Sequence, residues 1–145
     1  MATVRDILAN KGRHLNSIGA DATVFEAAVL MNEQRIGSLL VLEEARLIGI
    51  LTERDILQRV VAQQRDANQT SVGTVMTRDV IYCRQHTDVE EVRGIMRDRR
   101  VRHLPVMTEE GEVVGLISIG DLNAYQLQYH EQTIYHLQEY ISGTW

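Results

Sequence analysis

Hydrophobic positions along the chain recur with two different periods, and together they predict a mixture of helices and strands. From Thr23 onward, apolar residues return at helical spacing, which marks one face of an amphipathic helix. This first stripe consists of Val24, Ala27, Ala28 and Met31. Two short apolar runs follow, at 37–42 and 46–51, and runs of this length are typical of buried strands. A second helical stripe consists of Ile56, Leu57, Val60 and Val61.

The same order of elements begins again after residues 62–71, which contain no large apolar side chain and are predicted to form an exposed linker. The short helical turn expected at Val4–Leu8 returns at Val72–Met76, and the extended segment expected at Leu15–Ile18 returns as a short strand at Val80–Cys83. The helical stripe returns as Val89, Val92, Ile95 and Met96. Residues that correspond in the two halves lie 65 to 68 positions apart. We therefore interpret the chain as a duplicated strand-helix-strand-strand-helix unit.

Each half has an apolar sheet that it cannot bury alone, so we expect the two halves to pack sheet to sheet. The predicted fold class is α/β, with two pseudo-symmetric repeats and an additional C-terminal helix. We place the first repeat at 1–61, the linker at 62–71, the second repeat at 72–127 and a helical tail at 128–145. Small-molecule clefts tend to form at interfaces of this kind.

A seven-residue segment at Gly49–Asp55 is repeated at Gly115–Asp121. Each copy reads glycine, two apolar residues, a hydroxyl residue, two spacers and aspartate, as expected where a strand ends and a helix begins. A capping box would use the hydroxyl of Thr52 or Ser118 to accept an amide hydrogen bond. A nucleotide site would use the same residues, because a carboxylate accepts paired hydrogen bonds from two ribose hydroxyls. The residues alone leave both interpretations open.

Composition narrows the class of protein. A hydrophobic fraction of 44% fits a soluble globular chain, while a net charge of −5 and a pI near 5.5 disfavour a general nucleic-acid binder. No segment resembles a signal peptide or reaches the length of a membrane span, so we expect a cytoplasmic location and no membrane partner. The single cysteine, Cys83, leaves no intrachain disulfide and fits a reducing compartment.

Four short segments in this order complete a recognisable pattern. They are Lys11-Gly12-Arg13, Thr52-Glu53-Arg54-Asp55, Arg102-His103-x-Pro105-Val106 and Ser118-Ile119-Gly120-Asp121. With the internal repeat, they resemble a tandem cystathionine-β-synthase (CBS) domain pair, also called a Bateman module, from about Val4 to Leu127. The chain looks most similar to the small stand-alone bacterial CBS-pair proteins.

The resemblance implies a regulatory module that binds adenosine-containing ligands in clefts between its repeats. Asp55 and Asp121 would then hold ribose hydroxyls, while the hydroxyl and basic residues would lie near the phosphates. The nucleotide-binding candidates are Thr52, Arg54, Asp55, Arg102, His103, Ser118, Gly120, Asp121, Lys11 and Arg13. The expected ligand is AMP, ADP, ATP or NAD(H), acting as a regulator and not as a catalytic cofactor. The sequence does not distinguish these ligands, because backbone groups largely read the base.

The first repeat departs from the pattern of the second. Gly37 and Ser38 stand where the second repeat has Arg102 and His103. Arg54, which aligns with Gly120, offers a compensating positive charge. Leu40 also replaces the proline that the second repeat keeps as Pro105. We therefore expect two unequal pockets.

The remaining polar and reactive residues favour structural roles. We expect Arg93, Arg97, Arg99 and Arg100 to form a solvated helix face. Arg102 and His103 are neighbours, and both can enter one cleft only if the strand has barely begun. The histidines lack metal-ligand spacing, and no catalytic motif occurs, so we expect neither a metal site nor an enzyme. Cys83 is interpreted as a core residue.

The predicted function is that of a nucleotide sensor that signals to an unidentified partner protein. A seam of Leu127, His130, Ile134, Leu137 and Ile141 has the spacing of helix–helix contacts and suggests a homodimer, unless it packs on its own subunit. A ligand-independent dimeric scaffold, in which both aspartate corners are only helix caps, is the first alternative. A small thiol- or nucleotide-processing enzyme acting through Cys83 is the second.

Overall fold

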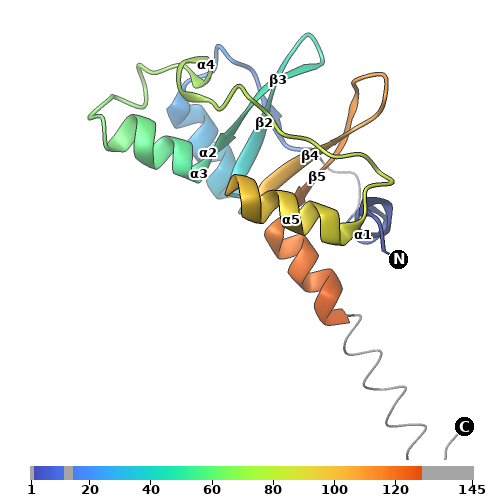
Figure 1. Ribbon diagram of the computed structural model, residues 1–145. Coiled ribbons are helices and arrows are strands. Elements are labelled where there is room, and N and C mark those ends of the chain that lie inside the picture. The colour runs from blue at the N-terminus through green and yellow to red at the C-terminus, as the bar shows by residue number, and fades with distance from the viewer. Residues whose placement is uncertain (1, 12–14, 129–145) are drawn as a thin grey trace, which may run out of the picture.

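The computed structural model describes residues 2–11 and 15–128 of the chain. The first half contains α1 (Val4–Lys11), β1 (Ser17–Ile18), α2 (Val24–Gln34), β2 (Ser38–Glu43), β3 (Arg46–Thr52) and α3 (Glu53–Ile56), which continues as a π-helical stretch, η1 (Leu57–Val61). The second half contains α4 (Val72–Val75), α5 (Val89–Arg99), β4 (His103–Met107), β5 (Val113–Ser118) and a helix over 119–128. This order confirms the α/β fold class and the internal duplication (Figure 1).

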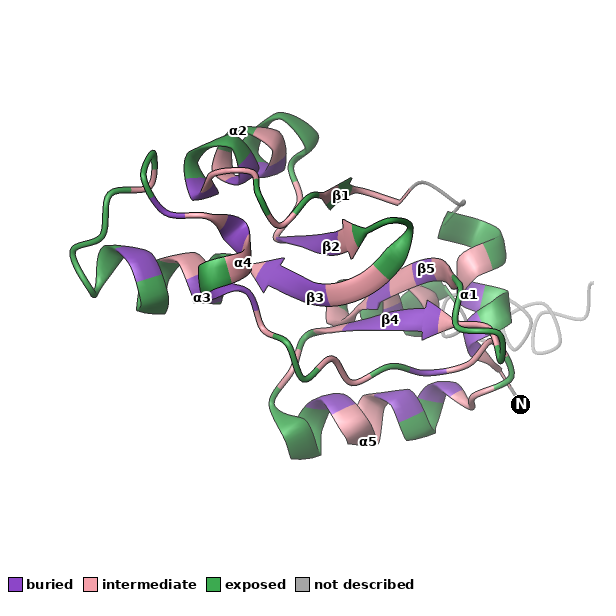
Figure 2. Ribbon diagram, turned by 90° about the horizontal axis from the view of Figure 1, so that it is seen from above, coloured by how far each residue is buried: buried purple, intermediate pink, exposed green. Residues whose placement is uncertain are grey.

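The strands form two small sheets that lie side by side between helices. In the first sheet β1 runs parallel to β2, and β2 runs antiparallel to β3, whereas the second sheet is the antiparallel pair of β4 and β5. Figure 2 shows α2 on one side of this arrangement and α5 on the other. Leu40 and Ile50, which pair across β2 and β3, are buried although they belong to neither core cluster. Both faces of the first sheet are therefore covered.

Across the described residues, no helix combines the length and apolar character that crossing a membrane would require.

The predicted strand at Val80–Cys83 is wrong, because only Cys83 forms a bridge, to Val106. In the first half, the amide of Leu40 donates to the carbonyl of Asn16 and extends the ladder of β1. The residue that corresponds to Leu40 is Pro105, which has no amide hydrogen and cannot donate such a bond. Pro105 therefore marks the second repeat in the sequence and also limits the predicted strand at Val80–Cys83 to a single bridge.

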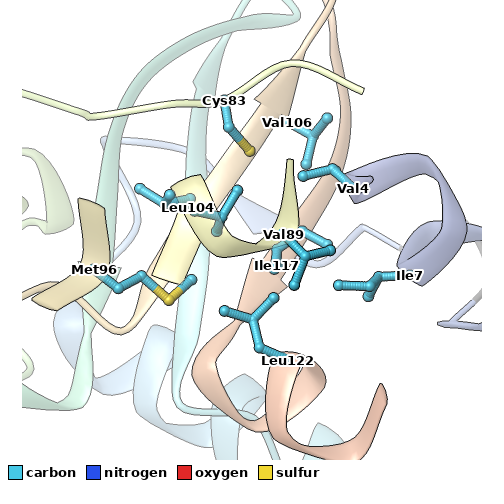
Figure 3. Packing of buried hydrophobic residues seen from close by; sticks show 10 residues of the cluster. Val4, Ile7, Cys83, Val89, Met96, Leu104, Val106, Ile117 and Leu122 are labelled. Carbon is cyan, nitrogen blue, oxygen red and sulfur yellow. The ribbon is translucent and has the colours of Figure 1, made fainter. Parts of the chain in front are cut away.

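Each half completes its core with the helix that precedes the other half. The core of the second half contains Val4 and Ile7 of α1, packed among Leu104, Ile117 and Leu122 (Figure 3). All five side chains are at most 3% exposed. Because the first helix belongs to the core built by the last strands, the two halves are interlocked.

The reciprocal exchange completes the core of the first half. Val72 and Val75 of α4 join a buried cluster with Leu39, Leu51 and Val60. None of these five side chains is more than 2% exposed. The duplication is thus visible in the packing as well as in the order of elements.

Two glycines permit the exchanged segments to lie close to the strands. A Cβ atom on Gly115 of β5 would lie 2.5 Å from a methyl carbon of Leu8. On Gly49 of β3 it would lie 2.5 Å from the sulfur of Met76 and 2.9 Å from the backbone oxygen of Thr77. The glycine that opens each repeated segment is therefore needed for close packing.

The second helical stripe is less buried than its spacing predicts. Of its members, Val60 is 2% exposed, but Leu57 and Val61 are each 62% exposed. Phe25 and Val29 of α2 are also exposed, at 50% and 40%. Leu127 of the predicted C-terminal seam is 60% exposed, and the other members of that seam lie outside the described residues.

Candidate functional site

Both repeated segments form the capping box that their sequence predicts. Thr52 Oγ1 accepts a hydrogen bond from the amide of Asp55 at 3.2 Å, and the amide of Thr52 donates to Asp55 Oδ2 at 3.0 Å. In the second half, the amide of Asp121 donates to Ser118 Oγ at 3.1 Å, and the amide of Ser118 donates to Asp121 Oδ2 at 2.9 Å. Capping alone does not account for these aspartates, because each also binds a side chain from a distant part of the chain.

At the first corner, that side chain is Thr77. Its hydroxyl donates to Asp55, 3.0 Å from Oδ1 and 3.2 Å from Oδ2. The backbone of Thr77 is held by reciprocal hydrogen bonds with Ile50 of β3. Asp55 is only 6% exposed, and Arg59 Nε lies 4.0 Å from Oδ1. The carboxylate of Asp55 is thus buried. It accepts a hydrogen bond from the neutral Thr77 hydroxyl, and the guanidinium of Arg59 lies at the limit of ion-pair distance.

At the second corner, the side chain is Lys11, the only lysine in the chain. Its Nζ donates to Asp121 Oδ2 at 2.7 Å and to the carbonyl of Leu116 at 2.6 Å. Lys11 and Thr77 are 66 positions apart, as are Asp121 and Asp55, so the two contacts correspond. Asp121 has 23% of its side chain exposed, and Lys11 has 36%. One corner therefore contains a hydroxyl where the other contains an ammonium group.

A cavity of about 1110 Å³ opens between the two halves. The predicted site residues that line it are Thr52, Arg54, Asp55, Arg102, His103, Ser118 and Gly120. Lys11 and Asp121 pair with each other and are absent from this lining. Arg13 lies outside the described residues. Seven of the ten predicted residues thus meet around one cavity.

Arg102 and His103 both reach this cavity because β4 begins at His103. Arg102 precedes the strand and is free of the alternation that places neighbouring strand residues on opposite faces. Because the strand has barely begun at these two residues, both side chains can enter the same cavity.

The wall of the cavity is strongly basic. Six arginines line it, namely Arg54, Arg59, Arg93, Arg97, Arg100 and Arg102. The acidic residues of the lining are Glu53 and Asp55. At least six of the 15 Lys and Arg residues therefore gather here, counted over the described residues, in a protein whose net charge is −5. Such a concentration of one sign of charge in a cleft attracts anions.

The predicted solvated arginine face is largely exposed, and part of it also lines the cavity. Arg97, Arg99 and Arg100 are exposed, as expected, and Arg93 is partly buried. However, Arg93, Arg97 and Arg100 also line the cavity, because the end of α5 lies at the boundary between the halves. Helical periodicity identifies the polar face of a helix but not what lies opposite that face.

Among the described residues, two ionisable side chains have clearly shifted pKa values. Burial lowers the pKa of His103 below its ordinary 6.5, and the charges of Lys11 and Arg102 lower it further, against the opposing effect of Asp121 and Glu53. Burial, with a smaller contribution from Glu91, raises the pKa of Cys83 to about 12. His103 is therefore mostly neutral near pH 7, and the Cys83 thiol stays protonated and lacks the thiolate that a nucleophilic role requires.

Sequence reasoning missed Thr77 and Arg59, both of which contact Asp55. Thr77 could have been found by carrying Lys11 forward along the 66-residue offset. Arg59 gave no such signal, since its position follows from hydrogen bonds to the carbonyls of Val75 and Met76 at 3.1 and 3.0 Å. Within the described residues, no three His, Cys, Asp or Glu side chains lie close enough to hold a metal ion.

Comparison with known proteins identifies the duplicated unit. Residues 4–62 and 72–127 each match the family model described as CBS domain. The mitochondrial CBS domain-containing protein CBSX3 of Arabidopsis thaliana is 33% identical over 150 residues, which cover 97% of this chain and 72% of that protein. The crystal structure of the CBS-domain protein ATU1752 from Agrobacterium tumefaciens is 34% identical, with a TM-score of 0.82 over 86% of this chain and 99% of that one.

One similar structure contains bound ligands. The CBS domain pair of protein MJ0100 was crystallised with 5′-methylthioadenosine and S-adenosyl-L-methionine. It is 25% identical to this chain, with a TM-score of 0.78 over 89% of this chain and 98% of that one. Both of its ligands contain an adenosine-derived group.

Proposed function

The chain belongs to the CBS-domain family, and from this premise we propose that it is a regulatory module that binds an adenine nucleotide between its two repeats. The observation that carries the proposal is the meeting of the Thr52–Asp55 corner, Ser118 and basic side chains of both halves around one cavity. Its volume of about 1110 Å³ is ample for a nucleotide. The adenosine-derived ligands of the MJ0100 domain pair support the same class of ligand.

In the proposed complex, Asp55 accepts hydrogen bonds from the two ribose hydroxyls. A diol can take the place of the Thr77 hydroxyl, which already donates to both oxygens of this carboxylate. The exchange replaces one neutral donor with two others and leaves the capping bond from the Thr52 amide in place. Arg102 and Ser118, which line the cavity from the other repeat, are proposed to contact the phosphates.

The second corner binds more weakly in this proposal. A ribose at Asp121 must share the carboxylate with Lys11 or displace an ammonium group that lies 2.7 Å away. Displacing the ammonium group costs more than displacing the hydroxyl, because it also separates two opposite charges that form an ion pair. We therefore expect one nucleotide per chain at ligand concentrations that saturate the first corner.

Regulation follows from the position of the cavity between the halves. A ligand that contacts both repeats favours the arrangement in which these contacts coexist, and a partner protein can detect that arrangement. No enzymatic activity is included in the proposal, because the buried Cys83 thiol stays protonated at neutral pH.

Isothermal titration with AMP, ADP, ATP, NAD(H) and S-adenosylmethionine tests the proposal. We expect saturable binding to the purified chain. At a ligand concentration 100 times the dissociation constant, the free energy of unfolding should rise by about 2.7 kcal/mol. If none of these ligands binds, the ligand-independent scaffold becomes the better account of the two capping boxes.

We also propose that the chain forms a homodimer through the apolar face of α2 and η1. This face exposes Phe25, Val29, Leu57 and Val61 beside a groove of about 650 Å³. Sedimentation over a dilution series should show that Leu57→Asp dissociates the dimer. Removal of residues 128–145 should have a smaller effect. If truncation alone dissociates the dimer, the association surface is the C-terminal segment instead.

A further inference from the structure

The six arginines of the cavity wall fall into two groups when their partners within the protein are considered. Arg59 donates to two backbone carbonyls, and Arg97 contacts the neighbouring Asp98 at 3.3 Å. Arg93 donates to Asn123 and Gln126 of the helix over 119–128. These three guanidinium groups are already engaged in the fold.

The other three arginines have no such partner. The side chain of Arg54, from the first repeat, forms no hydrogen bond or ion pair with any described residue, and neither do the side chains of Arg100 and Arg102 of the second repeat. Three guanidinium groups facing one cavity repel one another, and none of them forms an ion pair with a described carboxylate. An anion bound between the repeats would supply the missing partners.

We infer that the preferred ligand carries a chain of two or more phosphates, which Arg54 of one repeat and Arg100 and Arg102 of the other bind together. This inference rests on the proposed adenine-nucleotide function and specifies it. A guanidinium pairs best with two oxygens at once, so three such pairs use about six acceptor oxygens when no oxygen is shared. One terminal phosphate offers only three. A nucleoside monophosphate can therefore pair with all three arginines only if they share its oxygens, whereas a chain of phosphates offers more of them.

The size of the cavity supports the same class of ligand. Its volume of about 1110 Å³ exceeds the usual range for small-molecule pockets, roughly 300–1,000 Å³. An adenosine at the Asp55 corner leaves the region toward Ser118 and Gly120 for a phosphate chain. Nucleoside di- and triphosphates would then connect the two repeats more firmly than AMP does.

The experiment measures dissociation constants for adenosine, AMP, ADP and ATP in metal-free buffer, and compares wild type with Arg54→Ala, Arg100→Ala and Arg102→Ala. We expect ATP to bind at least about tenfold more tightly than AMP, because its additional phosphates accept further charge-assisted hydrogen bonds from the three guanidinium groups. Each variant should reduce the preference for ATP, measured as the dissociation constant of AMP divided by that of ATP, by about fivefold or more. The affinity for adenosine should change less than about twofold. Inorganic tripolyphosphate should compete with ATP but not with adenosine.

Arg99→Ala is the matched control, because Arg99 adjoins Arg100, is exposed and does not line the cavity. It removes the same net charge and should leave the ratio unchanged. Arg54→Lys and Arg100→Lys keep the charge but remove the planar fork, so they should recover part of the lost selectivity.

Equal binding of AMP and ATP by wild type would overturn the polyphosphate inference and leave the proposed function standing. An equal loss of selectivity in Arg99→Ala would also overturn it, because general charge attraction would then explain the preference. Failure of all four ligands to bind would instead reject the proposed function.

Discussion

The ammonium of Lys11 lies 2.7 Å from Oδ2 of Asp121 and occupies the position that the Thr77 hydroxyl takes beside Asp55 in the other half. The exchange of a hydroxyl for a charge is one clear difference between the two corresponding corners. It gives the expected inequality of the two pockets a specific chemical basis.

Replacing Lys11 by threonine should make the second corner resemble the first. We expect a second equivalent of nucleotide to bind at concentrations where the wild type binds one. The free energy of unfolding without ligand should fall by no more than about 1 kcal/mol, because the pair is partly exposed. Titration calorimetry gives the stoichiometry, and a denaturant melt gives the stability. An unchanged stoichiometry would show that Lys11 does not limit the second corner.

Asparagine substitutions at the two aspartates should separate capping from ligand binding. Asp55→Asn places an amide nitrogen in a carboxylate site that is only 6% exposed, where two donors converge. We expect it to lower the unfolding free energy by about 1–3 kcal/mol and to abolish tight nucleotide binding. Asp121→Asn should cost about 1 kcal/mol or less and leave the tighter site intact. Equal losses of affinity in both variants would contradict the order of filling proposed here.

The lowered pKa of His103 predicts a specific dependence of stability on pH. As pH falls below about 6.5, the unfolded chain takes up a proton before folded His103 does, so the folded state loses stability. The stability associated with neutral, buried His103 is fully present above about pH 6.5, and it is lost as pH falls through the lowered pKa of His103 in the folded state. Urea melts from pH 7.5 to 5.5 should show that His103→Asn loses less stability than wild type over this range.

A phosphate near His103 should raise its pKa again. Nucleotide binding near pH 6.5 should therefore be accompanied by proton uptake, which calorimetry in buffers of different ionisation enthalpy measures. His103→Asn should remove this uptake. If the uptake is the same in both proteins, the phosphate itself or another group takes the proton.

The two glycines of the repeated segments should differ in their tolerance of alanine. At Gly115 the added methyl group meets only the flexible side chain of Leu8, which can rotate. At Gly49 it also meets the backbone oxygen of Thr77 at 2.9 Å. We expect Gly49→Ala to destabilise the chain by about 1–3 kcal/mol and Gly115→Ala by less. Thermal melts of both variants check the order, and the opposite order would show that Leu8 is the more rigid neighbour.

Much of the fold follows from the sequence, because the repeat and the hydrophobic periodicity report on local structure. The capping boxes at Thr52 and Ser118 form where the pattern places them. The strand at Val80–Cys83 does not form, and the reason lies in Pro105, far along the chain, which cannot donate the bond that Leu40 donates. A strand depends on its partner as much as on its own residues.

The candidate site is predictable to a similar extent. Motif residues such as Asp55 and Arg102 were identified because their spacing carries information. The helix pattern predicts that Arg100 is exposed, which it is, but does not reveal that the residue also faces the cavity. The pairing of Lys11 with Asp121 joins residues that are 110 positions apart, and no local pattern contains it.

The interlocked cores also have a consequence for how the chain is made. A ribosome releases the N-terminal end first, at roughly 5–20 residues per second. The core that buries Val4 and Ile7 is complete only after Leu104, Ile117 and Leu122 have emerged. The long loop between α1 and these residues must close before this core forms, and such loop closure slows folding. During translation the apolar side of α1 stays accessible to chaperones and to other nascent chains until nearly all of the second repeat has been synthesised.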